Sequence, residues 1–251
     1  NSLFFISGIL FNVLSGVISL LIIFNNTGIN SFLYYFLYIF GLMSISIALI
    51  NLLPFTSLNN ATDGKIFWSL VFKKPFSKKL IAINKVTSQL SSGIRPRDLD
   101  LAGLNNLQKD SVEEIEYMSI LYYYFNGLDN NDMDKLYYYS KLLKQNLTKF
   151  PAVILPALYY ELCFVACIMN SLEEATHYYR KCGKILQKDK DVNGLRVKAY
   201  YEYYINQDYI SAEEICISAI KVADKFPLKG QGIMEKELVT TLMSKLHSNI
   251  S

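Results

Sequence analysis

The stretch LFFISGILFNVLSGVISLLIIF, residues 3–24, carries no charged side chain and is long enough to cross a membrane. At about 1.5 Å per helical residue, a run of this length spans roughly 33 Å, and a bilayer's hydrocarbon core is about 30 Å thick. A secretory signal peptide is the alternative, but such a peptide has a basic leading region and a shorter apolar core. We therefore expect a membrane-spanning helix here.

A second apolar run of the same length, residues 32–53, ends at Pro54. The connecting residues 25–31, NNTGINS, are polar and contain a glycine, as turns do. All 25 Lys and Arg residues and all 22 Asp and Glu residues lie from Asp63 onward. The sequence therefore predicts an all-α protein, with a transmembrane helical hairpin followed by a polar helical region.

The lysines predict the orientation of this hairpin. The loop at residues 25–31 has no positive charge, whereas six lysines follow the second run before the next acidic residue, Asp98. These are Lys65, Lys73, Lys74, Lys78, Lys79 and Lys85. The positive-inside rule places them, and the domain after them, in the cytoplasm of a multi-pass membrane protein. Lysines beside a membrane span already have that role, so we expect no nucleic-acid partner.

The segment between Lys65 and Lys73 is apolar but short. Its seven residues, 66–72, cannot cross a bilayer and suit an interfacial or re-entrant segment with Trp68 at headgroup level, which extends the expected membrane region to residues 1–76. Asp63 lies just before it. A carboxylate at membrane depth is costly unless it is paired, hydrated or bound to a cation. The alternative is that Asp63 caps the following helix or begins the cytoplasmic domain.

Two motifs in the apolar region resemble those of a known family. Asn51, Pro54 and the Asp63–Gly64 pair form an Asn-x-x-Pro…Asp-Gly pattern over residues 51–64. Upstream, Gly8 and Asn12 stand four residues apart in the first run. Both patterns, in this order and separated by one hairpin, resemble those of the site-2 proteases, which are intramembrane zinc metallopeptidases.

The resemblance implies a function for each of these residues. Asp63 would be a ligand of Zn²⁺, and the other two protein ligands would be the histidines of a His-Glu-x-x-His helix that precedes these motifs in the family. Three protein ligands leave one zinc position for a water whose pKa falls to about 7. The substrate would be a transmembrane or membrane-proximal segment of another protein. The residues expected to shape the site or hold the substrate backbone are Gly8, Asn12, Asn51, Pro54 and Gly64.

The chain also departs from the family. Ile9 stands where a proline is usual, Lys65 stands where a second glycine is common, and the spacer between Pro54 and Asp63 has eight residues, more than in many members. No His-Glu-x-x-His occurs, and the two histidines, His177 and His247, lie far downstream. This chain alone would therefore be inactive. Since it opens directly into an apolar run without Met, we expect a C-terminal portion whose missing part carries that motif; a pseudoprotease is the alternative.

The polar region predicts a helix and linker over residues 77–110 and a helical-repeat domain over 111–251. Residues 171–186 and 209–224 share a small–large–small spacing, which also occurs near residue 133. The matched positions are Ala175, Tyr179 and Cys182; Ala212, Cys216 and Ala219; and Met133, Tyr137 and Ser140. Units 42 and 37 residues apart resemble tetratricopeptide repeats, which bind protein partners. An irregular helical bundle is the alternative.

Two residue types in this region invite a functional interpretation. Adjacent tyrosines point about 100° apart on a helix, so we expect one of each pair to pack inward, whereas an outward set would line a peptide-binding face. The four cysteines are expected to be buried and reduced. Cys163 and Cys167 share a helix face and could join His177 and Cys182 in a metal site, but their spacing fits no familiar zinc module. A non-catalytic membrane-anchored scaffold that binds a protein partner is the rival to the peptidase.

Overall fold

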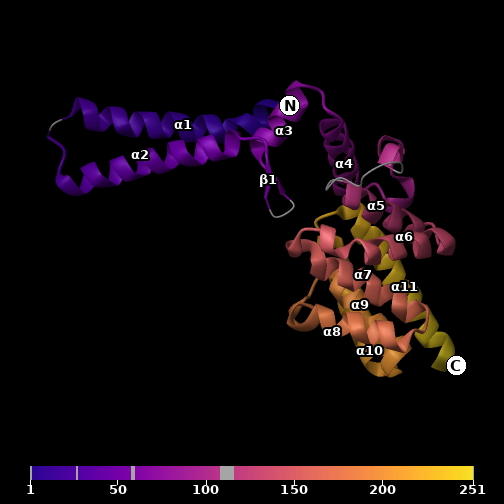
Figure 1. Cartoon of the computed structure of the whole chain (residues 1–251). Helices are drawn as coiled ribbons and strands as arrows, with labels where there is room; N and C mark the ends of the chain where they lie inside the picture. The colour runs from indigo at the N-terminus through magenta and orange to yellow at the C-terminus, as the bar shows by residue number, and fades with distance from the viewer. Residues whose placement is uncertain (1, 27, 58–59, 108–115, 251) are drawn as a thin grey trace. The chain divides into compact units, whose positions relative to one another are not determined.

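The computed structural model describes residues 2–26, 28–57, 60–107 and 116–250, and the chain forms two compact units, residues 1–80 and 81–251. The first unit contains the helices α1 (Ser2–Asn25), α2 (Ser31–Leu52) and α3 (Asp63–Val71), and α4 (Pro75–Ser92) begins within it. Two short strands, β1 (Thr56–Ser57) and β2 (Asn60–Ala61), pair antiparallel between α2 and α3 (Figure 1).

Helices α1 and α2 form a hairpin and lie side by side along their length (Figure 1). Glycines let the two backbones touch: a Cβ added to Gly16 would lie 2.9 Å from the carbonyl oxygen of Gly41. Small residues, Gly41, Ser44 and Ala48, form the buried side of α2. Close backbone approach through small residues is how helices pack where no hydrophobic effect drives them together.

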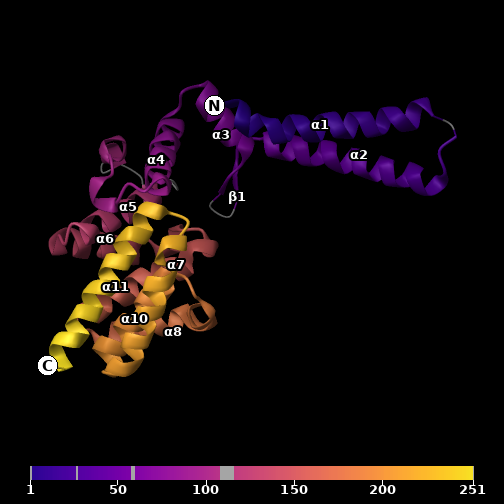
Figure 2. The ribbon, with the colours of Figure 1, turned by 180° about the vertical axis from the view of Figure 1, so that it is seen from behind.

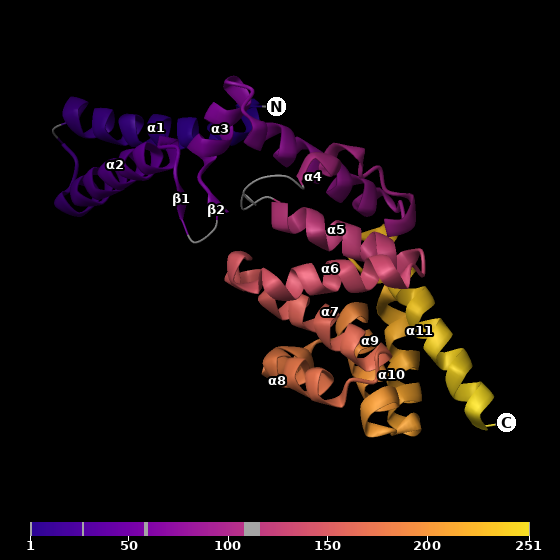
Figure 3. The same cartoon turned by 45° about the vertical axis from the view of Figure 1, so that its right-hand side comes forward.

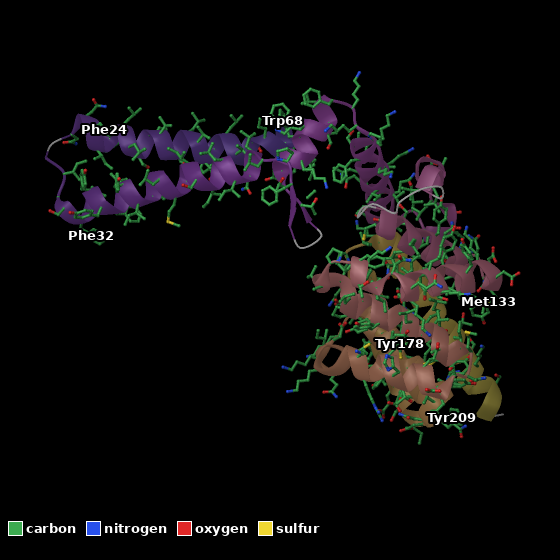
Figure 4. All side chains as sticks on the ribbon, in the orientation of Figure 1. Phe24, Phe32, Trp68, Met133, Tyr178 and Tyr209 are labelled. Atoms are coloured by element: carbon green, nitrogen blue, oxygen red, sulfur yellow. The ribbon has the colours of Figure 1, made fainter. Side chains whose placement is uncertain are left out.

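The large apolar side chains of this hairpin point outward instead. Phe24 and Phe32, near the connecting turn, are 80% and 82% exposed (Figure 4). By length and composition, Phe4–Asn25 and Ser31–Leu52 could each cross a membrane. The predictions of helices at residues 3–24 and 32–53 are thus confirmed to within two residues. Asn30, whose side chain accepts a hydrogen bond from the Leu33 N–H at 2.8 Å, begins the second helix.

Helix α3 packs against both α1 and α2. Its buried positions are the small residues Gly64 and Ser69, whereas Val71 and the following Phe72 are exposed. The segment expected over residues 66–72 is therefore helical, but the helix begins three residues earlier, at Asp63.

The second unit is helical throughout its described part (Figures 2 and 3). After α4 and the 3₁₀ turns Pro96–Asp98 and Ala102–Leu107, the helices are α5 (Glu116–Asp129), α6 (Met133–Gln145), α7 (Leu155–Ile168), α8 (Leu172–Lys188), α9 (Val192–Tyr201), α10 (Tyr209–Val222) and α11 (Lys229–Ile250). Further 3₁₀ turns lie at Leu147–Lys149, Ala152–Ile154 and Ala223–Lys225, and a π-helical turn at Glu202–Asn206. The expected linker, residues 77–110, is mostly α4 and two 3₁₀ turns; residues 108–115 lie outside the described ones.

Three consecutive hairpins, α5–α6, α7–α8 and α9–α10, share one turn. In each, a residue with left-handed backbone is followed by the residue at the N-cap position of the second helix, and the left-handed residues, at positions 131, 170 and 207, are 39 and 37 apart. The paired residues are Asn131 and Asp132, Asn170 and Ser171, and Gln207 and Asp208. At the second and third hairpins, the matched residues Ala175, Cys182, Ala212 and Ala219 are buried. In the remaining matched pair, Cys216 is buried and Tyr179 is half-buried.

The register predicted for the first hairpin, α5–α6, is wrong by three residues. Met133, expected to match the small residue Ala175, is 43% exposed, because it is the first residue of α6. Counting from the turn, Leu136 and Leu143 occupy the matched buried positions, at 1% and 0% exposure. Leucines therefore occupy in α6 the two buried positions that small residues occupy in α8 and α10.

The core of the second unit runs between α7, α9 and α11. Tyrosine pairs divide as expected at Tyr159–Tyr160, where Tyr160 is buried, but Tyr200 and Tyr201 are both buried. All four cysteines are buried, as predicted. Burial raises the pKa of Cys182 and of Cys216 to about 12, so both stay protonated thiols.

Candidate functional site

The candidate site lies where α2 ends and α3 begins. Pro54 stands just after the last turn of α2 and supplies no N–H to extend the helix. Thr62 joins the two helices. Its hydroxyl donates to the Leu53 carbonyl at 2.7 Å and accepts from the Lys65 N–H at 3.2 Å, which caps α3. One side chain thus connects the end of one helix to the start of the next.

The spacer between these points is a closed hairpin. Thr56 pairs with Ala61 and Ser57 pairs with Asn60, while the Thr62 N–H donates to the Phe55 carbonyl at 3.1 Å. The spacer therefore leaves the helix ends and returns to nearly the same place, with residues 58 and 59 outside the described part.

Gly64 brings the two motif segments together. A Cβ at this position would lie 2.7 Å from the Asn51 carbonyl oxygen and would overlap the Leu52 carbonyl even more closely. Real Cβ atoms do not approach backbone so closely, so only glycine allows α3 to rest on the last turn of α2. Asn51, Asp63 and Gly64, which the motif separates by up to thirteen positions, are therefore neighbours.

Asp63 is the first residue of α3, and its side chain is exposed. A carboxylate there is favoured by the partial positive charge at a helix N-terminus. The residue that caps the helix is Thr62, so the alternative that Asp63 caps it is wrong; Asp63 lies in the first turn. Asp63 is also the only acidic residue of the first unit, whose sequence contains no His or Cys.

The other expected site residues are dispersed. Asn12 is half-buried in the middle of α1 and Pro54 is exposed. Gly8 is exposed too, and a Cβ added there would meet nothing within 4 Å, so packing does not require glycine at this position. The close approach between α1 and α2 uses Gly16 instead. Sequence inspection missed it, although two glycines in facing apolar runs were a visible signal.

The residues of this chain do not by themselves fit a zinc ion. In the described part of the chain, no three His, Cys, Asp or Glu side chains are grouped so that they could hold a metal. His247 contacts Glu213 at 3.1 Å. His177 shares a surface hollow with the cations Lys144, Arg180 and Lys181 and the carboxylates Glu173 and Glu174. Among the residues that the motifs single out, Asp63 is the one whose side chain could bind a metal as an anion.

Sequence inspection also missed a buried ion cluster in the second unit. Arg196 is fully buried, and its guanidinium donates to Glu161 at 2.7 and 2.9 Å and to Glu235 at 2.5 Å. Burial raises the pKa of Glu235, although Arg196 opposes this. Tyr124 donates to Glu161 at 3.0 Å. Helices α5, α7, α9 and α11 therefore meet at one set of charges.

A cleft of about 350 Å³ lies on the same helices. Phe164, Tyr200 and Met234 line it, and the Arg196 guanidinium lies 4.2 Å from the centre of the Phe164 ring. Lys245, which donates to the Tyr204 hydroxyl at 3.0 Å, stands at its edge. Arg95, Asp129, Glu237 and Lys245 also line the cleft, so its lining combines apolar and aromatic side chains with charges of both signs.

Comparison with known proteins adds no assignment. No family model matches the chain, and no curated protein or solved structure matches it either. The function must therefore be inferred from the residues and their geometry.

Proposed function

We propose that this chain is the C-terminal portion of a membrane-embedded zinc metallopeptidase of the site-2 type, in which Asp63 is a metal ligand. The observation that carries the proposal is the contact of Gly64 with the Asn51 and Leu52 carbonyls, because it gathers the separated Asn-x-x-Pro and Asp-Gly motifs into one place. The two motifs meet at one end of the α1–α2 hairpin, whose helices are each long and apolar enough to span a bilayer.

The packing of the first unit supports its insertion in a membrane. In α2, small residues face inward and large apolar residues face outward, the reverse of a helix in water. The buried positions of α3 are small residues too. The lysines after α3 then favour a cytoplasmic second unit. In this arrangement Asp63 stands near the inner surface of the bilayer, where a substrate's transmembrane or membrane-proximal segment reaches it.

The zinc site requires ligands that this sequence does not contain. The family's His-Glu-x-x-His histidines would complete it, and zinc would supply an activated water. Asn12, Asn51 and Pro54 would shape the site and hold the substrate backbone, and Gly64 would fix the position of Asp63. Without the histidines the chain is inactive.

The second unit is, in this proposal, a tetratricopeptide-like array that recruits a substrate or regulator. Its three equivalent turns, 39 and 37 residues apart, support a repeat architecture. The aromatic cleft between the helices is large enough to take one or two side chains of a partner protein.

The decisive experiment uses the complete reading frame. An in-frame His-Glu-x-x-His on an apolar helix upstream is expected. In that protein, Asp63→Asn should weaken zinc binding at least about tenfold and abolish cleavage of a reporter with a transmembrane segment. Asp98→Asn, which removes an exposed carboxylate in the second unit, is the matched control and should retain both properties. Unchanged cleavage by Asp63→Asn would refute the ligand role.

The cleft favours a second candidate, a non-catalytic membrane-anchored scaffold or pseudoprotease that binds a protein partner. A start codon next to Asn1, with no upstream histidine motif, would favour it over the peptidase. Substitution of Tyr204 or Lys245 would then abolish partner binding, whereas Asp63→Asn would not.

A further inference from the structure

The connection between α3 and α4 is a strongly basic surface. Residues 65–79, here named the basic elbow, contain Lys65, Lys73, Lys74, Lys78 and Lys79 and no acidic residue. Lys73, Lys74 and Lys78 are exposed, and no carboxylate within the described ranges lies at ion-pairing distance from any of these three. Lys73, Lys74 and Lys78 therefore present positive charge that no carboxylate of the described residues pairs.

Aromatic side chains stand directly beside these charges. Trp68 and Phe72 stack with ring centroids 5.7 Å apart, and Phe72 is 63% exposed (Figure 4). Gly64 and Ser69 are the buried positions of α3, Trp68 is half-buried, and Val71 and Phe72 at the end of the helix are exposed. An exposed apolar and aromatic face edged by lysines is the composition of segments that lie in a membrane interface.

The backbone of the elbow carries an independent signal. Helix α3 ends with Lys73 in left-handed conformation (φ 49°), with hydrogen bonds from the Lys74 N–H to the Ser69 carbonyl (2.9 Å) and from the Lys73 N–H to that of Leu70 (3.3 Å). Three other helices end with the same pair of bonds. Their left-handed residues are Gly93, Asn131 and Asn170.

Glycine and asparagine are the residues that tolerate this conformation, and lysine is not. The chain uses glycine or asparagine at three equivalent helix ends and a lysine at the fourth, where the charges gather. Gln207 (φ 55°), after the π-helical turn, is another left-handed residue that is neither glycine nor asparagine. A left-handed lysine is uncommon, and at this position it adds a charge to the elbow where glycine would relieve the backbone.

We propose that the basic elbow binds the headgroups of anionic phospholipids at the cytoplasmic face of the bilayer, with Trp68 and Phe72 at the boundary between headgroups and acyl chains. The lysine stems extend along the apolar surface while their ammonium groups reach the phosphates. Each lysine near an anionic surface strengthens attraction roughly fivefold. This binding does not depend on a metal at Asp63, so it stands or falls separately from the peptidase.

The only tryptophan of the sequence makes the proposal measurable. The full chain is reconstituted in vesicles of phosphatidylcholine in which a fraction of the lipid is either brominated phosphatidylglycerol or brominated phosphatidylcholine. Bromine quenches fluorescence on contact, so the ratio of the two quenching curves measures the preference for anionic lipid next to Trp68. We expect a preference of at least about fivefold at low ionic strength, which falls in 0.5 M salt because the charges are screened.

Three variants separate lipid binding from folding. K73Q/K74Q/K78Q should reduce the preference to about one, whereas K181Q/K184Q/K188Q, which removes three exposed charges of α8, should leave it unchanged. Lys73→Gly should lower the preference partly while the thermal stability of the chain stays equal or rises, because glycine relieves the left-handed conformation. Equal quenching by the two brominated lipids, or an equal loss in the α8 control, would overturn the proposal.

Discussion

Replacing Arg196 by methionine should destabilise the second unit more than any exposed substitution. Arg196 is fully buried between Glu161 and Glu235 and gives them three hydrogen bonds of 2.5 to 2.9 Å. Methionine keeps much of the contact with Phe164 but supplies neither charge nor donor. Two carboxyl groups would then face each other in the core without a cation.

Breaking a buried ion pair by removing one partner costs about 3–5 kcal/mol, because the other charge is left buried. Glu235 relieves part of this cost by taking a proton, since burial already raises its pKa above 4.5. Glu161 keeps the Tyr124 hydroxyl as a donor. We therefore expect a loss of about 4 kcal/mol at pH 7.

The pH dependence has a definite sign. A group whose folded pKa is raised contributes stability that is present below its unfolded pKa and is lost as pH rises through the folded value. Stability from Glu235 should therefore fall with rising pH, and fall further in Arg196→Met. Glu235→Gln, which mimics the protonated form, should remove this dependence.

Hydrogen exchange of the full chain in detergent, read on peptides of α7, α9 and α11, measures the opening free energy. Arg180→Met is the matched control, because Arg180 is exposed on α8, and it should change this free energy by less than about 0.5 kcal/mol. A loss below about 1 kcal/mol in Arg196→Met would refute the buried cluster.

Three further outcomes follow from single positions. Gly64→Ala should cost at least about 3 kcal/mol of stability at α3 by hydrogen exchange, because the Cβ overlaps backbone, while Gly8→Ala should be neutral or slightly stabilising. Asp129 is buried, which opposes ionisation. Hydrogen bonds from Arg95 and Arg97 outweigh burial and lower the pKa of Asp129 below 3.8. The stability that ionised Asp129 supplies should be present above pH 3.8 and lost as pH falls through the lowered pKa. The melting temperature of Asp129→Asn should therefore change less with pH in acid than that of the unsubstituted chain. Gly183, at φ 51° and ψ −138°, has a backbone that alanine cannot adopt, so Gly183→Ala should lower the melting temperature by an amount equivalent to about 1–3 kcal/mol.

The helical class and the two long apolar helices could be predicted because they follow from a simple quantity, the absence of charge before Asp63. The first residue of α3 could be predicted less accurately. Its cap is the hydroxyl of Thr62, and serine and threonine are so common in that segment that no single one marks the helix start. The first repeat was misplaced by three residues because the small–large–small spacing was matched at Met133. The turn pair Asn131 and Asp132 would have set the register correctly.

Interactions between distant residues were beyond reach of the sequence patterns. Arg196 lies 35 positions from Glu161 and 39 from Glu235, and nothing local distinguishes these three from exposed charges. Gly64 could be predicted as a motif residue, but not as the point where α3 meets the α2 carbonyls. Such a contact depends on how a connecting loop closes in space.

The Thr62 hydroxyl makes the length of that loop unimportant to the position of Asp63. Thr62 holds both Leu53 and Phe55, so the described residues on either side of positions 58 and 59 leave the scaffold and return to it at one point. Insertions or deletions in this loop should change its reach into the surroundings while leaving the separation of Asn51 and Asp63 intact.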